Sequence, residues 1–192
     1  MISKSRGLRS RLPVLLALLV AAIVGAHGTG RADPPPATSG DRTVLEGCLE
    51  LVSQNLMKGG DGSESEAAGP AGRLASAARA AATRYESCIG AVSIPCQQEP
   101  GGEATLGMME CIQREWAVWD ERLNRIYREQ LKGAEPKLAN ALRETQRTWL
   151  KWRELKCAWP ALDNEGGSIV GPLYNSCMLD TTALQAIWLE HR

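Results

Sequence analysis

Apolar residues recur every three or four positions along most of the C-terminal half of the chain, and this spacing constrains the fold more than any other feature. It predicts three helices: residues 105–132, residues 136–159, and a last helix after the loop 161–171. Gly133 suits the end of the first helix, whereas Pro160 should stop the second. No stretch alternates in the way that a half-buried strand would, so we expect an all-α protein.

The apolar stripes predict which side of each helix is buried. They comprise Ile112, Trp116, Trp119, Leu123 and Ile126/Tyr127 in the first helix, Leu138, Leu142, Thr145, Trp149 and Trp152 in the second, and Leu173, Cys177, Thr181, Leu184 and Trp188 in the third. The chain has six Trp and no Phe, so large indole side chains should fill much of the interior. We expect Trp149 and Trp152 in the core, and the sequence leaves the burial of Trp159 open.

Two shorter helices are expected before this half, over 43–57 and 73–90. A Gly-, Ser- and Glu-rich loop, 59–72, separates them, and residues 91–102 read as a second loop. Short connections between the three C-terminal helices favour a small antiparallel bundle in which the first two form a hairpin. The predicted fold is therefore a bundle of three main C-terminal helices plus two N-terminal helices.

The N-terminus reads as a secretory signal peptide, residues 1–32. A basic stretch precedes the apolar run 12–26, which is shorter than the roughly 20 residues of a membrane span. Cleavage is expected after Ala26 or Ala32. Cleavage after Ala32 leaves 17 basic and 22 acidic residues, a net charge of −5. We therefore expect a periplasmic or secreted protein without a membrane span. Its acidic net charge disfavours binding to nucleic acid and favours a cationic partner.

Six cysteines follow the expected signal peptide: Cys48, Cys88, Cys96, Cys111, Cys157 and Cys177. An even number in an exported chain predicts up to three disulfides, and the lack of Cys-x-x-Cys pairs and of histidines argues against a metal site. Cys111 points away from its apolar stripe, where the segment carrying Cys96 could return over it. Cys157 lies at the end of the second predicted helix and Cys177 near the start of the third, across one loop. The favoured pairs are Cys96–Cys111, Cys157–Cys177 and, by remainder, Cys48–Cys88, and Cys111–Cys157 is their main rival.

Candidate catalytic groups are few. The only histidine certain to remain after signal cleavage is His191, next to the C-terminus, so a nucleophile would lack the usual base. The helical carboxylates, such as Glu115 and Glu154, read as solvated faces without an acid–base spacing. The segment 101–107 lacks the lysine of a phosphate loop. We expect no enzyme, no metal and no cofactor.

Polar residues beside the stripes form a second pattern. Asp120, Leu123, Asn124 and Tyr127 share a face of the first predicted helix, and Gln146, Trp149, Arg153 and Cys157 share a face of the second. Buried polar groups beside a tryptophan stripe need hydrogen-bond partners. We expect these residues to form a polar network between the first two helices, with a recognition patch as the alternative.

These residues also carry a resemblance to a known family. The motifs D-x-x-L-N-x-x-Y (120–127), Q-x-x-W-x-x-x-R-x-x-x-C (146–157), Gly-Gly-Ser (166–168) and C-x-x-x-x-T (177–182, ending in Thr182) resemble the LprI-like family of small exported helical domains named after a lysozyme inhibitor. The similarity covers about residues 96–190. One departure is Gln185, where the family usually has an arginine whose ion pair would be missing. The expected organisation is a signal peptide (1–32), an N-terminal helical extension (33–95) and an LprI-like domain (96–192).

The resemblance implies that the protein binds and inhibits a lysozyme-type muramidase by occluding its cleft, in protection of the cell envelope. The loop after the second helix is the candidate contact, because its glycines let the backbone approach a partner closely. It comprises Asp163, Asn164, Glu165, Gly166, Gly167 and Ser168. The expected partner is a basic lysozyme. The alternative is a cell-wall glycan-binding or envelope-stress structural module without inhibitory activity, which exposed coplanar tryptophans would favour.

Overall fold

A computed structural model of the chain describes residues 36–58, 84–164 and 166–192, all within the unit Pro34–Arg192. The expected signal peptide and the expected loop 59–72 lie outside the described residues. So do most of the expected helix 73–90 and Glu165 of the candidate loop.

The described residues are helical and contain no strand, which confirms the all-α fold. The helices are α1 (Ser39–Lys58), the 3-10 helix η1 (Tyr85–Cys88), α3 (Ser93–Gln97), α4 (Thr105–Lys132), α5 (Pro136–Asp163) and α6 (Val170–His191). The bounds of α4 are those predicted, and Gly133 follows its last residue. The segment 91–102 is not all loop, because it contains α3.

Pro160 does not stop α5, contrary to expectation, and the helix continues to Asp163. A proline removes the hydrogen bond that its own N–H would have made to the preceding turn, and its ring crowds the carbonyl of the residue four positions earlier, but it leaves the other helical hydrogen bonds in place. So close to the helix end, the remaining bonds suffice. The backbone N–H and the side-chain Nδ2 of Asn164 both donate to the Pro160 carbonyl, at 3.1 and 2.8 Å.

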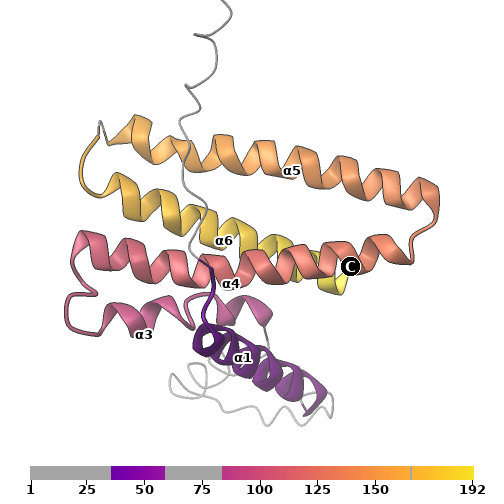
Figure 1. Cartoon of the computed structure of the whole chain (residues 1–192), viewed down its shortest axis with the longest axis horizontal. Helices are drawn as coiled ribbons and strands as arrows, with labels where there is room; N and C mark the ends of the chain where they lie inside the picture. Colours follow the sequence, from indigo (N-terminus) through magenta and orange to yellow (C-terminus); the bar gives the residue numbers. More distant parts are fainter. Residues whose placement is uncertain (1–35, 59–83, 165) are drawn as a thin grey trace, which may run out of the picture. The chain divides into compact units, whose positions relative to one another are not determined.

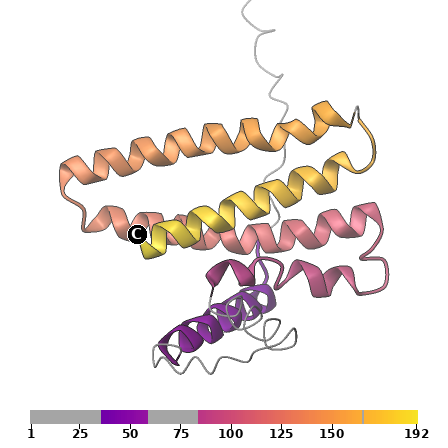
Figure 2. The same cartoon turned by 180° about the vertical axis from the view of Figure 1, so that it is seen from behind.

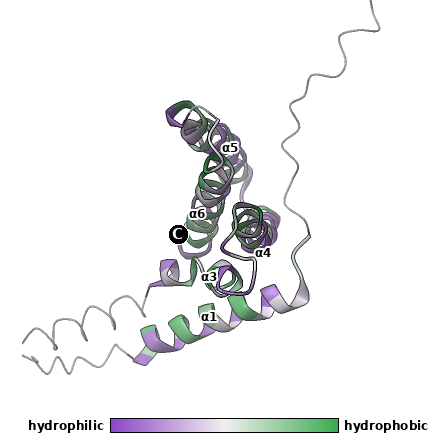
Figure 3. Cartoon of the chain, turned by 90° about the vertical axis from the view of Figure 1, so that its left-hand side faces the viewer, coloured by the Kyte–Doolittle hydropathy of each residue, from purple (hydrophilic) through white to green (hydrophobic). Residues whose placement is uncertain are grey.

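The helices are stacked in layers with α6 in the middle. α6 packs against α4 on one side and α5 on the other, and α1 and α3 pack against α4 (Figures 1 and 2). Seen end on, α5 lies farthest from α1 (Figure 3). The expected packing of α5 directly on α4 is therefore wrong: a short turn joins the two helices, but α5 rests on α6.

The core confirms the predicted stripe of α4. Ile112, Trp116, Trp119, Leu123 and Ile126 are all buried. Leu45, Leu49 and Val52 of α1 belong to the same cluster. The described part of the N-terminal extension therefore shares its hydrophobic core with the C-terminal helices.

The predicted stripe of α6 is wrong in part, because Leu173, Leu184 and Trp188 are partly exposed. The helix lies between two others and buries residues on two sides instead. The buried set includes Tyr174, Met178, Leu179, Ala183, Ala186 and Leu189. A helix covered on both sides has no single apolar stripe, so a one-face pattern does not describe it.

Three disulfides staple the layers, and they are the three pairs favoured from the sequence. Cys48–Cys88 joins α1 to η1, Cys96–Cys111 joins α3 to α4, and Cys157–Cys177 joins α5 to α6. The described residues contain no free cysteine. Each bridge connects two elements that are also in contact, so covalent and packing constraints coincide.

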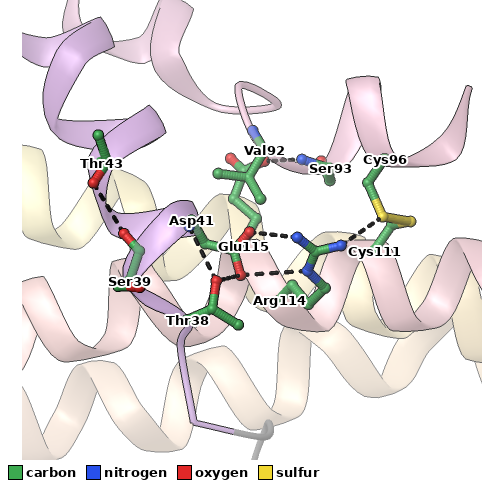
Figure 4. Close-up of polar contacts among 10 residues, drawn as sticks. All are labelled: Thr38, Ser39, Asp41, Thr43, Val92, Ser93, Cys96, Cys111, Arg114 and Glu115. Carbon is green, nitrogen blue, oxygen red and sulfur yellow. Dashed lines mark hydrogen bonds and ion pairs between the residues drawn. A yellow bond between two sulfur atoms is a disulfide. The ribbon is translucent and has the colours of Figure 1, made fainter. Parts of the chain in front are cut away.

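A buried carboxylate fastens the segment before α4 to that helix. Glu115 is fully buried and accepts hydrogen bonds from the backbone N–H groups of Val92 (3.0 Å) and Ser93 (2.7 Å) (Figure 4). It also accepts from the backbone N–H of Gly90 (2.6 Å) and the indole N–H of Trp119 (3.2 Å). The expectation of a solvated Glu115 is wrong. Val92 is the N-cap of α3 and Ser93 its first residue, so this carboxylate satisfies two N–H groups at the start of a helix that have no helical partner.

A second acidic group ties α1 to α4 (Figure 4). Asp41 is buried and accepts hydrogen bonds from Arg114 Nη2 (2.6 Å), Arg114 Nε (3.3 Å) and the Thr38 hydroxyl (2.7 Å). Burial by itself raises the pKa of Asp41, but the hydrogen bonds from Arg114 and Thr38 and the charge of Arg114 outweigh it. The pKa therefore lies below the ordinary 3.8.

This lowered pKa predicts a pH dependence of stability. A carboxylate whose pKa falls on folding stabilises the protein above its unfolded pKa, and the contribution is lost as pH falls through the folded pKa. We expect Asp41→Asn to lower the free energy of unfolding by about 1–2 kcal/mol at neutral pH. The difference from the parent protein should shrink between about pH 4 and pH 2. Urea unfolding across that range measures it, and a pH-independent difference would contradict the assignment.

Candidate functional site

The polar residues predicted on α5 form the inner face of that helix, and their partners lie on α6. Gln146 Oε1 accepts a hydrogen bond from Gln185 Nε2 at 3.0 Å. Arg153 Nη1 donates to the Thr182 hydroxyl at 2.9 Å. The network between α5 and α4 that the sequence suggested is therefore wrong in its partner helix, because α6 lies between the two. The contact between Gln146 and Gln185 joins two neutral side chains.

The polar set predicted on α4 makes its contacts apart from the set on α5. Leu123 is buried and Tyr127 is partly buried against the core. Asn124 is exposed and donates to Asp120 within the helix at 2.8 Å. Asp120 and Asn124 line a groove shared with Arg42 of α1. The α4 and α5 sets therefore do not form one patch.

Three tryptophans of α5 and α6 are exposed to a large extent. The exposed fractions are 49% for Trp152, 60% for Trp159 and 47% for Trp188. The prediction of Trp152 as a core residue is wrong, whereas Trp149 is partly buried against the core. The side of α5 that is buried carries Gln146 and Arg153 and differs from the predicted stripe. Trp152 and Trp159 therefore lie on the exposed part of the helix.

Basic side chains accompany two of the α5 tryptophans. The guanidinium of Arg153 lies 4.8 Å from the ring centroid of Trp149, and Lys156 Nζ lies 4.9 Å from that of Trp152. Both distances are those of cation–π contacts. The helix thus combines exposed aromatic area with positive charge.

A groove of about 670 Å³ opens between α5 and α6 beside these rings. It is lined by Trp149, Trp152, Trp188, Glu144, Thr145, Thr148 and Gln185. Aromatic faces flanked by hydroxyl, amide and carboxylate groups can stack on sugar rings and hydrogen-bond to their hydroxyls. The groove is therefore a second candidate binding site.

The candidate loop joins α5 to α6 at one end of the two-helix layer. Its described residues are exposed, and Gly166 has a φ of +80°, a conformation that favours glycine. The Gly167 N–H donates to the Asn164 carbonyl at 3.0 Å, and the Val170 N–H to that of Gly167 at 3.0 Å. The loop is thus built from successive turns, and Cys157–Cys177 closes the two helices behind it.

The described ranges 36–58, 84–164 and 166–192 contain neither a metal-binding cluster nor a membrane-spanning helix. No group of three or more His, Cys, Asp or Glu residues in these ranges could hold a metal ion. Nor is any helix within them both long enough and apolar enough to cross a membrane.

The fold and its surfaces define a class: a disulfide-bonded helical domain with exposed tryptophans on α5 and α6. Residues 96–189 match the family model described as lysozyme inhibitor LprI. The matched segment runs from α3 through α6 and includes two of the three disulfides. No curated protein and no solved structure matches the chain. The family description is that of inhibitors, not of enzymes.

Proposed function

We propose that this protein is exported, binds a lysozyme-type muramidase and inhibits it by covering the substrate cleft. The observation that carries the proposal is the family match over residues 96–189. Three disulfides support it, since a protein that acts outside the cytoplasm benefits from covalent staples. The net charge of −5 expected after removal of residues 1–32 suits a basic partner.

The contact we propose is the loop Asp163–Ser168. A muramidase cleft is a concave groove, and a segment that enters it must protrude and must let its backbone approach closely. The exposed loop with its two glycines meets both needs, and the disulfide behind it limits the entropy lost when it binds. Asp163 would meet the basic rim of the enzyme.

The test is a muramidase assay with the purified oxidised protein and a charge-reversal variant, Asp163→Lys. We expect the parent protein to inhibit and the variant to inhibit at least about tenfold less, a loss of roughly 1.4 kcal/mol in binding. Glu103→Lys is the matched control, since Glu103 is also exposed and precedes α4, far along the chain from the loop. Equal losses in both variants would show that net charge matters and that the loop does not.

The second candidate function is binding of cell-wall glycan, which the exposed Trp152 and Trp188 in the α5–α6 groove favour. A pull-down on purified peptidoglycan, run beside the assay, separates the two. Absence of inhibition at micromolar excess together with retention on the wall polymer would reject the inhibitor and support the glycan-binding module.

A further inference from the structure

α5 carries a second apolar stripe that no other described helix covers. Trp152, Leu155, Trp159 and Leu162 follow one another at spacings of three, four and three residues, which places them on one face of a helix. Their exposed fractions lie between 49% and 72%. The opposite side of α5 is the one that packs on α6, through Leu142, Gln146, Arg153 and Cys157.

A stripe of this kind is unusual on a protein surface. Single exposed leucines or tryptophans are ordinary, but two tryptophans and two leucines in one helical row form a contiguous apolar patch that marks an interaction surface. The row runs along the C-terminal half of α5, the helix that lies farthest from α1 (Figure 3). It is therefore open to a partner that is broad and flat.

The charges beside the stripe select the partner. At about 100° per residue, Lys151 and Lys156 fall on either flank of the stripe, and the exposed Asp163 falls on the flank of Lys156 at the C-terminal end. α5 as a whole has six basic and three acidic residues. Two copies meeting through this face would bring Lys151 and Lys156 of one copy close to those of the other, and like charges repel. An anionic surface complements the positive charge of these lysines. Their aliphatic stems can lie along the apolar row while their ammonium groups stay in water.

We propose that the Trp152–Leu162 stripe of α5 binds the surface of an anionic lipid bilayer. The helix would lie in the plane of the interface, with the tryptophan and leucine side chains at the boundary between headgroups and acyl chains. Lys151 and Lys156 would contact the lipid phosphates. This surface does not depend on muramidase inhibition, and it would hold the protein at a membrane while leaving α4 and α1 facing away.

Co-sedimentation with lipid vesicles tests the proposal. The oxidised protein should bind vesicles of phosphatidylglycerol with phosphatidylethanolamine, and bind much less to vesicles of phosphatidylcholine alone. High salt should weaken binding, because the charge attraction is screened. Brominated lipids in the anionic vesicles should quench tryptophan fluorescence, and Trp159→Tyr should reduce that quenching. Failure to bind anionic vesicles would overturn the proposal.

Two matched pairs of variants locate the surface. Leu155→Ser with Leu162→Ser should reduce vesicle binding at least about tenfold, whereas Leu51→Ser with Leu106→Ser should not, although those leucines of α1 and α4 are as exposed. Lys151→Gln with Lys156→Gln should reduce it roughly 25-fold, about fivefold per charge, and Lys58→Gln with Lys132→Gln much less.

The same variants distinguish a lipid bilayer from a second copy of the chain as the partner of the stripe. Vesicle binding that survives the Leu155/Leu162 change would overturn the assignment to this stripe. A parent protein that sediments as a dimer, becomes monomeric in that variant and ignores vesicles would assign the stripe to a second copy instead. Muramidase inhibition is measured in parallel, so that loss of lipid binding with inhibition intact separates this inference from the proposed function.

Discussion

Replacing Glu115 with alanine is expected to lower the free energy of unfolding by about 3–5 kcal/mol. The carboxylate is fully buried and accepts three backbone N–H groups and one indole N–H. Alanine would leave all four donors without that acceptor in a site closed to water. Chemical denaturation with the disulfides intact measures the loss.

Two further variants make this prediction specific. Glu110→Ala removes an exposed carboxylate from the same helix and should change stability by less than about 0.5 kcal/mol. Glu115→Gln keeps one acceptor oxygen, so it should fall between the parent and the alanine variant. If Glu115→Ala does not fold, the loss of unfolding free energy in Glu115→Gln still tests whether the carboxylate stabilises the protein. A loss below about 1 kcal/mol in both would mean that the segment before α4 is held by other contacts.

Removal of the Cys48–Cys88 bridge by Cys48→Ser and Cys88→Ser is expected to cost about 4 kcal/mol. The bridge spans a sequence separation of 40, so its loss returns considerable freedom to the unfolded chain. α1 should detach first, since apart from its contacts with η1 it packs chiefly on α4. Hydrogen exchange of α1 amides, together with denaturant unfolding, measures both effects.

The Cys96–Cys111 bridge is the internal comparison for this prediction. Its sequence separation is 15, and the chain-entropy argument gives it about 3 kcal/mol. The pair Cys96→Ser and Cys111→Ser should therefore cost less than the Cys48/Cys88 pair. The reverse order would show that local packing around α3 outweighs loop closure.

α4 shows how much a one-dimensional pattern can predict. Its large apolar residues repeat at helical spacing, and both the helix bounds and the buried set from Ile112 to Ile126 agree with the structure. The helix also buries Cys111, Ala117 and Val118, which lie outside the predicted stripe, because α1 and α3 pack on it as well as α6. The favoured cysteine pairs also agree with the structure. That inference needed only the direction of Cys111 on its helix and the closeness of Cys157 to Cys177 across one loop.

α5 shows where such a pattern fails. Its most apolar side, with Leu138 and Trp152, is exposed, and its buried side carries Gln146 and Arg153. The most apolar side of a helix need not be the buried side when polar residues on another side find hydrogen-bond partners on the neighbouring helix. Here Gln185 and Thr182 of α6 supply hydrogen bonds to the buried polar groups. Nothing in the spacing of α5 alone reveals those partners.

The sequence by itself therefore determined the helical class and the apolar stripe of α4, favoured the cysteine pairs that the structure contains, and showed the resemblance of residues 96–190 to one family. The layer order was decided only by the tertiary structure, because α6 is buried on two sides and separates α4 from α5. That order turns the polar residues of α5 inward, where α6 satisfies them. It also leaves Trp152, Leu155, Trp159 and Leu162 outside, because a helix packed on one neighbour alone can bury only one of its faces.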